Sequence, residues 1–315
     1  MTRFPSRSLA VFAAALLPAA ACAPRSVSVG SPATTSTSTT TASAAPTTSS
    51  ASTRTIGAVG APVGLQLWSL RSMSKDPAAL LKLARSMGIT HVETAGLYNM
   101  TPEQMAEAVR GAGLRVTSMH VGLDDFKKDP QKVIATAKTL GARYVGTAWY
   151  PHQGAFTEAD ARKAIADFNA IGKTMKDAGL QFFYHNHGYE PVAYGDGTLL
   201  DLIIRETDPE LVKFEMDVLW TFLPNVDPAA LIRKYPGRFK LMHIKDMKPG
   251  VPRGSLSGGL PDSLQAVIGQ GQVNWPDVLK AAKADGLEHY YLEDETPDPV
   301  KNIPPSVEYL ERIRF

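Results

Sequence analysis

The chain has 315 residues, of which 44% are apolar and 20% are charged, and its 33 basic side chains nearly balance its 31 acidic ones. This length and apolar content suffice for a large buried core, and one barrel domain takes about 250 residues. A balanced charge gives no basic surface of the kind that DNA or RNA binding requires, so we expect no nucleic-acid partner.

Residues 1–22 are predicted to be an export signal. Arg3 and Arg7 precede an apolar run from Leu9 to Ala21. The run has the length of a signal-peptide core and is short for a membrane span. We therefore expect an exported, periplasmic or membrane-anchored protein.

The only cysteine, Cys22, offers a candidate lipid-attachment site. It follows Leu-Pro-Ala-Ala-Ala, which resembles the processing site of bacterial lipoproteins, although Ala19 stands where leucine is usual. Ordinary cleavage after Ala21 or Ala23 therefore competes with lipidation. A single cysteine also excludes a disulfide within the chain.

Residues 23–61 are predicted to be a disordered tether. They are dominated by Ser, Thr, Ala and Pro and show no periodic apolar pattern. Such a segment cannot bury enough surface to offset the entropy lost on ordering. The folded domain is accordingly expected to occupy residues 62–315.

A helical pattern followed by glycine and then an extended run recurs through this domain. Glycine accepts the positive φ just past a helix end, so each such glycine indicates a helix-to-strand joint. The joints lie at Gly88, Gly113, Gly141, Gly179 and Gly286, with two more at Asp208-Pro209 and Pro236-Gly237. Eight strands are predicted: Val63 to Trp68, Thr90 to Glu93, Arg115 to His120, Tyr144 to Trp149, Gln181 to His185, Val212 to Asp217, Phe239 to Lys245 and Tyr290 to Glu293.

Helical stretches between these strands predict an α/β fold with a parallel sheet. Eight alternating units favour closure into a (β/α)8 TIM barrel. An open doubly wound sheet is the alternative, but it usually has a Gly-rich turn after its first strand, and Leu-Trp-Ser-Leu-Arg-Ser has no glycine. The predicted helices are Pro77 to Met87, Pro102 to Ala112, Pro130 to Leu140, Glu158 to Ala178, Pro228 to Tyr235 and Trp275 to Ala284.

Four residues that end successive predicted strands indicate a metal site. The carboxyl ends of all strands in a parallel barrel open onto one face, where polar side chains converge. Two imidazoles and two carboxylates suit manganese, iron, cobalt or zinc. These residues are His185, Asp217, His243 and Glu293.

Several motifs together resemble the sugar phosphate isomerase/epimerase family, especially its exported members. That family has the xylose isomerase-like TIM barrel and belongs to the AP endonuclease family 2 superfamily, and the resemblance covers Pro62 to Phe315. The motifs are Gly64-Leu-Gln-Leu-Trp-Ser-Leu-Arg71, His91-Val-Glu-Thr-Ala-Gly96, Ser118-Met-His-Val121, Tyr184-His-Asn-His-Gly-Tyr-Glu190, His243-Ile-Lys-Asp246, Gly269-Gln-Gly-Gln-Val-Asn-Trp275 and Leu292-Glu-Asp-Glu295.

The resemblance implies a divalent cofactor, with Mn²⁺ expected and Zn²⁺, Co²⁺ or Fe²⁺ as alternatives. Epimerase-type members hold it with Glu, Asp, His and Glu from their last four strands. Asp217, His243 and Glu293 match the last three ligands, whereas His185 stands in place of the first Glu. His187 lies two residues on and competes with His185 for that role. The departure matters because the first and last Glu of those epimerases are also the two proton-transfer bases.

The same resemblance suggests catalytic residues. Glu293 is the expected base, and Glu190 or a histidine, above all His187, is expected to handle the second proton. Further residues near the barrel mouth are expected to bind substrate, and a Gly-, Ser- and Pro-rich flap is predicted from Pro249 to Gly271. The substrate-binding candidates are Trp68, Glu93, His120, Trp149 and Lys245.

We therefore expect a metal-dependent isomerase or epimerase that acts on a small keto sugar by proton abstraction through an enediolate. A lyase or dehydratase acting on keto-glycosides or keto-inositols is the first alternative, because the missing Glu weakens a two-base epimerase. A non-catalytic sugar-binding lipoprotein is the alternative from another class.

Overall fold

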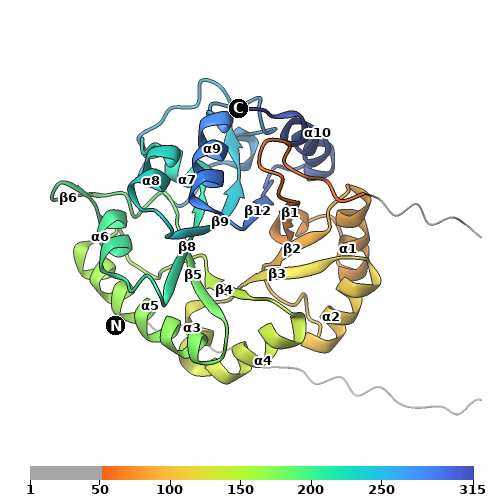
Figure 1. Ribbon diagram of the computed structural model, residues 1–315, viewed down its shortest axis with the longest axis horizontal. Coiled ribbons are helices and arrows are strands. Elements are labelled where there is room, and N and C mark those ends of the chain that lie inside the picture. The colour runs from red at the N-terminus through yellow and green to blue at the C-terminus, as the bar shows by residue number, and fades with distance from the viewer. Residues whose placement is uncertain (1–51) are drawn as a thin grey trace, which may run out of the picture. The chain divides into compact units, whose positions relative to one another are not determined.

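Eight parallel strands close into one barrel in the computed structural model, which describes residues 52–315 (Figure 1). Neighbouring strands follow the order β1-β12-β9-β8-β5-β4-β3-β2 around the barrel. The predicted TIM barrel is confirmed, including each of its eight strands. Their bounds are β1 (Val63–Gln66), β2 (His91–Thr94), β3 (Arg115–His120), β4 (Tyr144–Thr147), β5 (Gln181–His185), β8 (Val212–Asp217), β9 (Phe239–Ile244) and β12 (His289–Leu292).

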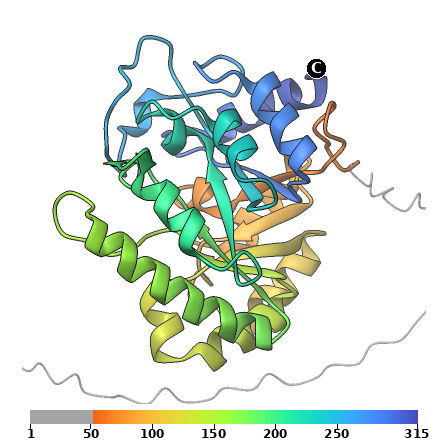
Figure 2. The ribbon, with the colours of Figure 1, turned by 60° about the vertical axis from the view of Figure 1, so that its left-hand side comes forward.

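Helices surround the strands on the outside of the barrel (Figures 1 and 2). All six predicted helices are present, and α3, α6, α7 and α10 were not predicted. None of the helices in residues 52–315 has both the length and the apolar character of a membrane span. The helices are α1 (Pro77–Ser86), α2 (Pro102–Gly111), α3 (Leu123–Lys128), α4 (Pro130–Leu140), α5 (Glu158–Asp177), α6 (Leu199–Glu206), α7 (Val218–Phe222), α8 (Pro228–Lys234), α9 (Trp275–Asp285) and α10 (Pro299–Arg312).

Local sequence fixes where these helices begin and end. Thr101 and Gln104 form a reciprocal capping box at the start of α2, which also has proline in its first turn. At the other end, Gly141 after α4 and Gly286 after α9 adopt φ angles of 77° and 73°. A side chain would strain this left-handed conformation, so glycine ends both helices and directs the chain into the next strand.

Four barrel strands end earlier than the sequence suggests, β9 and β12 by one residue and β1 and β4 by two. β1 stops at Gln66, whose side-chain oxygen accepts the Trp68 N–H at 3.1 Å and caps a 3-10 helix, Leu67–Leu70. β4 stops at Thr147. Trp68, in this 3-10 helix, and Trp149, in the loop after β4, therefore lie beyond the strands at the barrel mouth.

The expected domain boundary at Pro62 is too late. Ile56 is fully buried in the core, and Thr55 forms a β-bridge with Pro62. The Gly57 N–H donates to the Leu310 carbonyl at 2.9 Å. Residues 54–61 thus pack as part of the domain rather than as tether, whereas the predicted signal, Cys22 and most of the tether lie outside the described residues.

The predicted flap is anchored at its base. It begins just after β10 (Asp246–Met247) and includes β11 (Gln265–Ala266), and the two short strands pair antiparallel. The Asp246 carboxylate accepts the N–H of Gln272 at 3.0 Å and the indole N–H of Trp275 at 2.8 Å. The segment therefore leaves and rejoins the barrel at fixed points, and motion of its middle remains a prediction.

We expect Ile56→Ala to lower the free energy of unfolding by about 2–5 kcal/mol, because it leaves a cavity in the core. The matched control Val300→Ala truncates a side chain that is 37% exposed. It should change the free energy of unfolding by less than about 0.5 kcal/mol. Urea denaturation followed by circular dichroism measures both. Equal midpoints for Ile56→Ala and the wild type would show that residues 54–61 do not stabilise the barrel.

Candidate metal centre and active-site cavity

A cavity of about 590 Å³ opens at the carboxyl ends of the barrel strands. His185, His243 and Glu293 line its inner end, and Lys245 lies beside them. Trp68 and Trp149 line its wall and are 43% and 45% exposed. The cavity thus leads from solvent to the strand-end residues that the sequence indicates.

The four predicted ligands converge at this inner end. His185 Nε2 lies 3.0 Å from His243 Nδ1 and 3.4 Å from Asp217 Oδ2. His243 Nδ1 lies 3.3 Å from Glu293 Oε2. One ligand atom from each residue falls within 4.8 Å of the others, an arrangement that could hold one metal ion. Between the two candidates for the first ligand, the structure brings His185 into this group and leaves His187 outside it.

The hydrogen bonding of Asp217 fits a bound cation. Its Oδ1 accepts the Trp220 N–H at 2.9 Å and caps α7. Its Oδ2 is buried, points toward His185 and His243, and accepts no hydrogen bond from any residue in the described part of the chain. An unpaired buried carboxylate oxygen is unfavourable, and burial raises the pKa of Asp217. A divalent cation would satisfy this oxygen.

His185 and Glu293 are in protonation states suited to ligation, whereas His243 would have to lose a proton. Burial alone would lower the pKa of His243, but Glu215 and Glu293 hold it well above its usual value. Burial, together with the neighbouring His243 and His120, holds the pKa of His185 well below its usual value, so its imidazole is neutral. Burial alone would raise the pKa of Glu293, but Lys245 and His243 hold it well below its usual value. A neutral imidazole and an ionised carboxylate are the forms that bind metals.

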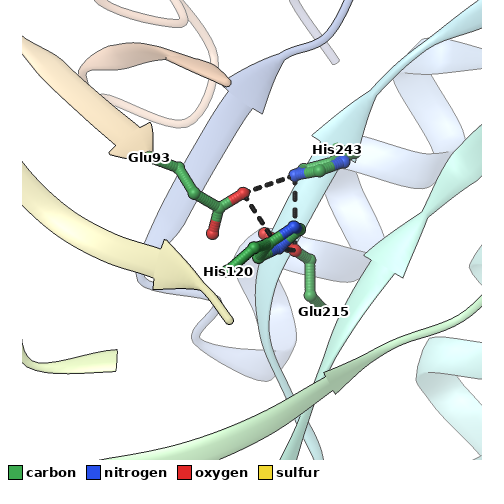
Figure 3. Close-up of side chains that lie close together, drawn as sticks. All are labelled: Glu93, His120, Glu215 and His243. Atoms are coloured by element: carbon green, nitrogen blue, oxygen red, sulfur yellow. Dashed lines mark hydrogen bonds and ion pairs between the residues drawn. The ribbon is translucent and has the colours of Figure 1, made fainter. Parts of the chain in front are cut away.

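A second cluster of imidazoles and carboxylates lies next to the first (Figure 3). His243 Nε2 is 2.6 Å from Glu93 Oε2, and His120 Nε2 is 2.8 Å from Glu215 Oε2. Burial opposes ionisation of both carboxylates. His120 and His243 nevertheless hold the pKa of Glu93 at about 2, while burial and the Glu93 charge raise that of Glu215 to about 7.

The two clusters share His243, so they cannot both bind a metal through it. A neutral imidazole offers one lone pair, and its other nitrogen carries a proton. His243 Nδ1 faces Asp217 and Glu293, whereas Nε2 faces Glu93. Each cluster contains one buried carboxylate oxygen without a hydrogen-bond partner, Asp217 Oδ2 in the first and Glu215 Oε1 in the second. Access from the cavity separates them: His185, His243 and Glu293 of the first cluster line it, whereas Glu93 and Glu215 are fully buried and do not. The first cluster is therefore the candidate metal site, and the His243 Nε2–H would then be donated to Glu93.

Lys245 brings a buried positive charge to the cavity. Its Nζ lies 3.0 Å from Glu293 Oε2, pairs with the Glu295 carboxylate, and sits 5.0 Å from the centre of the Trp220 ring. Burial alone would lower the pKa of Lys245, but these carboxylates and Asp217 raise it above its usual value. The ammonium group therefore stays charged next to the candidate metal ligands.

Glu93 was expected at the barrel mouth and Glu190 in a catalytic role, but neither carboxylate lines the cavity. Glu190 is fully buried, and its carboxylate accepts the His187 N–H at 2.9 Å and the Tyr184 hydroxyl at 2.5 Å. Burial raises its pKa to about 8. Glu93 is likewise fully buried and receives the amide of Gln66 at 2.7 Å. Both carboxylates position histidines from behind the cavity wall, because their own hydrogen bonds hold them there.

The remaining candidates do line the cavity. They are Trp68, His120, Trp149, His187 and Lys245. Sequence reasoning missed Glu215, Glu295 and Trp220. Glu215 lies two residues before Asp217 on one strand, so strand alternation alone places both on the barrel's inner side and could have identified it.

Comparison with known protein families agrees with this fold. Residues 81–313 match the family described as xylose isomerase-like TIM barrel. Inosose dehydratase 2 of Bacillus cereus is 28% identical over 242 residues, which cover 72% of this chain and 76% of that protein. Inosose dehydratase of Lacticaseibacillus casei is 23% identical over 49% of this chain, and this match spans only 52% of that relative. The chain thus spans about half the length of the Lacticaseibacillus casei relative and about three quarters of the Bacillus cereus one.

Solved structures give the same picture. A sugar phosphate isomerase/epimerase from Parabacteroides distasonis is 27% identical, with a TM-score of 0.65 over 80% of this chain and 98% of that one. An IolI protein described with a bound zinc atom is 14% identical, with a TM-score of 0.65 over 79% of this chain and 95% of that one. The second likeness shows the fold alone.

We expect about one manganese, iron, cobalt or zinc ion per chain after reconstitution, as measured by elemental mass spectrometry. Asp217→Ala should lose this metal, because it removes the unpaired carboxylate oxygen. The control Asp124→Ala, which removes an exposed carboxylate on the cavity wall, should retain it. A wild-type protein without metal after reconstitution would contradict the assignment.

We expect Glu93→Gln to weaken metal affinity by about 10- to 100-fold, because His243 loses the carboxylate that fixes its tautomer. Competition with a coloured chelator measures the affinity, and Glu103→Gln, an exposed carboxylate on α2, serves as the matched control. Unchanged affinity in Glu93→Gln would show that the second cluster does not support the first.

Proposed function

Because the chain belongs to the xylose isomerase-like TIM barrel family, we propose that it is a divalent-metal-dependent enzyme that removes the proton beside the ketone of a keto sugar or keto-cyclitol. The convergence of His185, Asp217, His243 and Glu293 at the inner end of an open cavity carries this proposal. Such a donor set beside a charged lysine suits chemistry in which negative charge develops on oxygen.

Each part of the site has a task in this reaction. A divalent cation held there would polarise the ketone and stabilise the negative charge that develops as the proton leaves. Glu293 is the proposed base, because it is ionised and faces the cavity. Lys245 keeps Glu293 ionised and adds a second positive charge near the ketone oxygen.

The second proton transfer is proposed for an imidazole. His187 follows β5 and His120 ends β3, and both line the cavity on walls away from the Glu293 segment. Glu190 fixes the backbone of His187, and Glu215 binds His120. A histidine so placed can protonate a group on the carbon next to the one that loses its proton.

We place elimination ahead of epimerisation. Three carboxylates line the cavity: Glu293 and Glu295, which follow β12, and Asp124, which is exposed on α3. No carboxylate stands at position 185, so none faces Glu293 from β5. In the elimination, the proton passes to Glu293, a histidine protonates the departing oxygen on the next carbon, and an unsaturated ketone remains. The inosose dehydratases among the relatives support a lyase or dehydratase of this kind.

Isomerisation or epimerisation is the second candidate. Two solved structures at 26% and 27% identity are described as sugar phosphate isomerase/epimerases. In this version the imidazole returns the proton to carbon, and no bond to oxygen breaks. The same base, Glu293, serves both reactions.

We expect Glu293→Gln to slow exchange of the substrate's α-proton with D₂O by about 10²- to 10⁴-fold, the usual contribution of a general base. Proton NMR on a 3-keto-glucoside, an inosose and a ketohexose measures the exchange, with metal content determined in parallel. The matched control Glu308→Gln alters an exposed residue on α10 and should exchange like the wild type.

The products separate the candidates. Release of the leaving group with an unsaturated ketone supports elimination, and exchange without release supports isomerisation. If the metal-loaded wild type binds these sugars but exchanges no proton, the protein is a sugar-binding protein and the proposed reaction is wrong.

A further inference from the structure

The cavity changes character between its inner and outer ends. Imidazoles and carboxylates occupy the inner end, whereas Val121, Ala148 and Pro151 line the wall together with Trp68 and Trp149. A free keto sugar carries hydroxyl groups all round. The apolar surface of the outer cavity therefore has no obvious partner on a free keto sugar.

Exposed apolar side chains are concentrated here. Among residues 52–315 five large apolar side chains are exposed, and two of them, Trp68 and Trp149, line this one cavity. A third, Leu256, is 51% exposed and lies two residues from Gly258, which also lines the cavity. Exposed apolar surface gathered at one opening indicates a binding surface.

The Trp149 ring is held in place while nearly half of it stays exposed. It packs edge-to-face on Tyr189 with ring centres 4.7 Å apart and stacks with His152 at 5.4 Å. A Cβ built on Gly258 would lie 2.7 Å from the Trp149 ring, so the flap backbone comes close to the indole. A ring fixed in this way is ready to receive a ligand without first being ordered.

Trp68 is fixed on the other side of the opening. Its indole N–H donates to Glu295 Oε1 at 3.1 Å, and the Arg71 guanidinium lies 4.8 Å from the ring centre. Glu295 also pairs with Lys245. Through Glu295 and Lys245, Trp68 is connected to Glu293, the candidate base. These contacts fix the orientation of its ring, although the side chain is 43% exposed.

We propose that this aromatic rim, Trp68 with Trp149, is a second subsite that holds a ring linked to the reacting sugar, so that the substrate is a glycoside rather than a free keto sugar. This subsite rests on the proposed function, in which the reacting sugar binds at the inner end of the cavity. The ring is recognised by a flat face of C–H or aromatic carbon, which packs well on an indole. An aromatic aglycone and a second pyranose both have such a face.

Binding of three glucosides to the purified protein tests this subsite. Phenyl β-D-glucopyranoside carries an aromatic ring, cellobiose carries a second pyranose, and methyl β-D-glucopyranoside carries neither. None has a ketone, so none can turn over. We expect the phenyl glucoside, cellobiose or both to bind about tenfold more tightly than the methyl glucoside, as measured by isothermal titration calorimetry. The tighter of the two identifies the ring.

Variants of Trp149 test whether its side chain causes the preference for a glucoside that carries a second ring. Trp149→Ala should reduce the affinity ratio to about one, and Trp149→Phe should keep most of it because a ring remains. Phe315→Ala removes an equally exposed aromatic side chain, 45% exposed, at the C-terminus and should leave the ratio as in the wild type. Equal binding of all three glucosides, including no detectable binding, or a preference that survives Trp149→Ala, would overturn the subsite.

This outcome is independent of the test of the reaction. A ring preference that depends on Trp149 in a protein without proton exchange would keep the subsite and reject the proposed reaction. Proton exchange on free keto sugars without any ring preference would do the reverse.

Discussion

The arrangement of side chains at the candidate site depends on the neutralisation of buried negative charge. Burying an unpaired carboxylate is costly, so each must find a proton, a cation or several donors. The imidazoles of His120 and His243 serve one pair of carboxylates, and Lys245 serves another. One oxygen of Asp217 and one of Glu215 are left without a donor in the described residues, and a divalent cation at the candidate site would satisfy that of Asp217. The carboxylates are Glu93, Glu215, Asp217, Glu293 and Glu295.

His243 connects the buried layer to the cavity. Its Nε2 lies against Glu93, and its Nδ1 faces the candidate metal position. Because a neutral imidazole carries one proton, the carboxylate behind it decides which nitrogen is free to bind a cation. Strand alternation builds both layers at once: β8 supplies Glu215 to the inner one and Asp217 to the outer one.

Local patterns in the sequence were sufficient to predict the barrel and to place the four candidate ligands at its strand ends. Helix caps, joint glycines and apolar runs each span a few residues, and the closed parallel sheet follows from their repetition. Helix α10 was missed because it contains Pro304 and Pro305, which usually indicate a break. Ile56 was missed because the polar residues before it dominate the composition of its segment.

The errors at the site have a different cause. Glu190 was expected to transfer a proton, but a loop's direction after a strand depends on partners such as Tyr184, which hold the carboxylate behind the wall. Glu215 was overlooked because its partner His120 lies 95 residues away on β3. Nothing local distinguishes a buried carboxylate that has such a partner from one that faces substrate.

The imidazole at position 185 has a consequence for the metal itself. Two imidazoles and two carboxylates carry two negative charges, which a divalent cation balances, whereas a third carboxylate would leave an excess. Imidazole also favours zinc, cobalt and iron relative to magnesium or manganese, which prefer oxygen ligands. Fewer anionic ligands leave the cation a stronger Lewis acid toward a ketone. In the proposed reaction, an imidazole in place of the first Glu removes one proton-transfer base but would strengthen polarisation of the ketone, and this combination suits elimination with an imidazole as the acid.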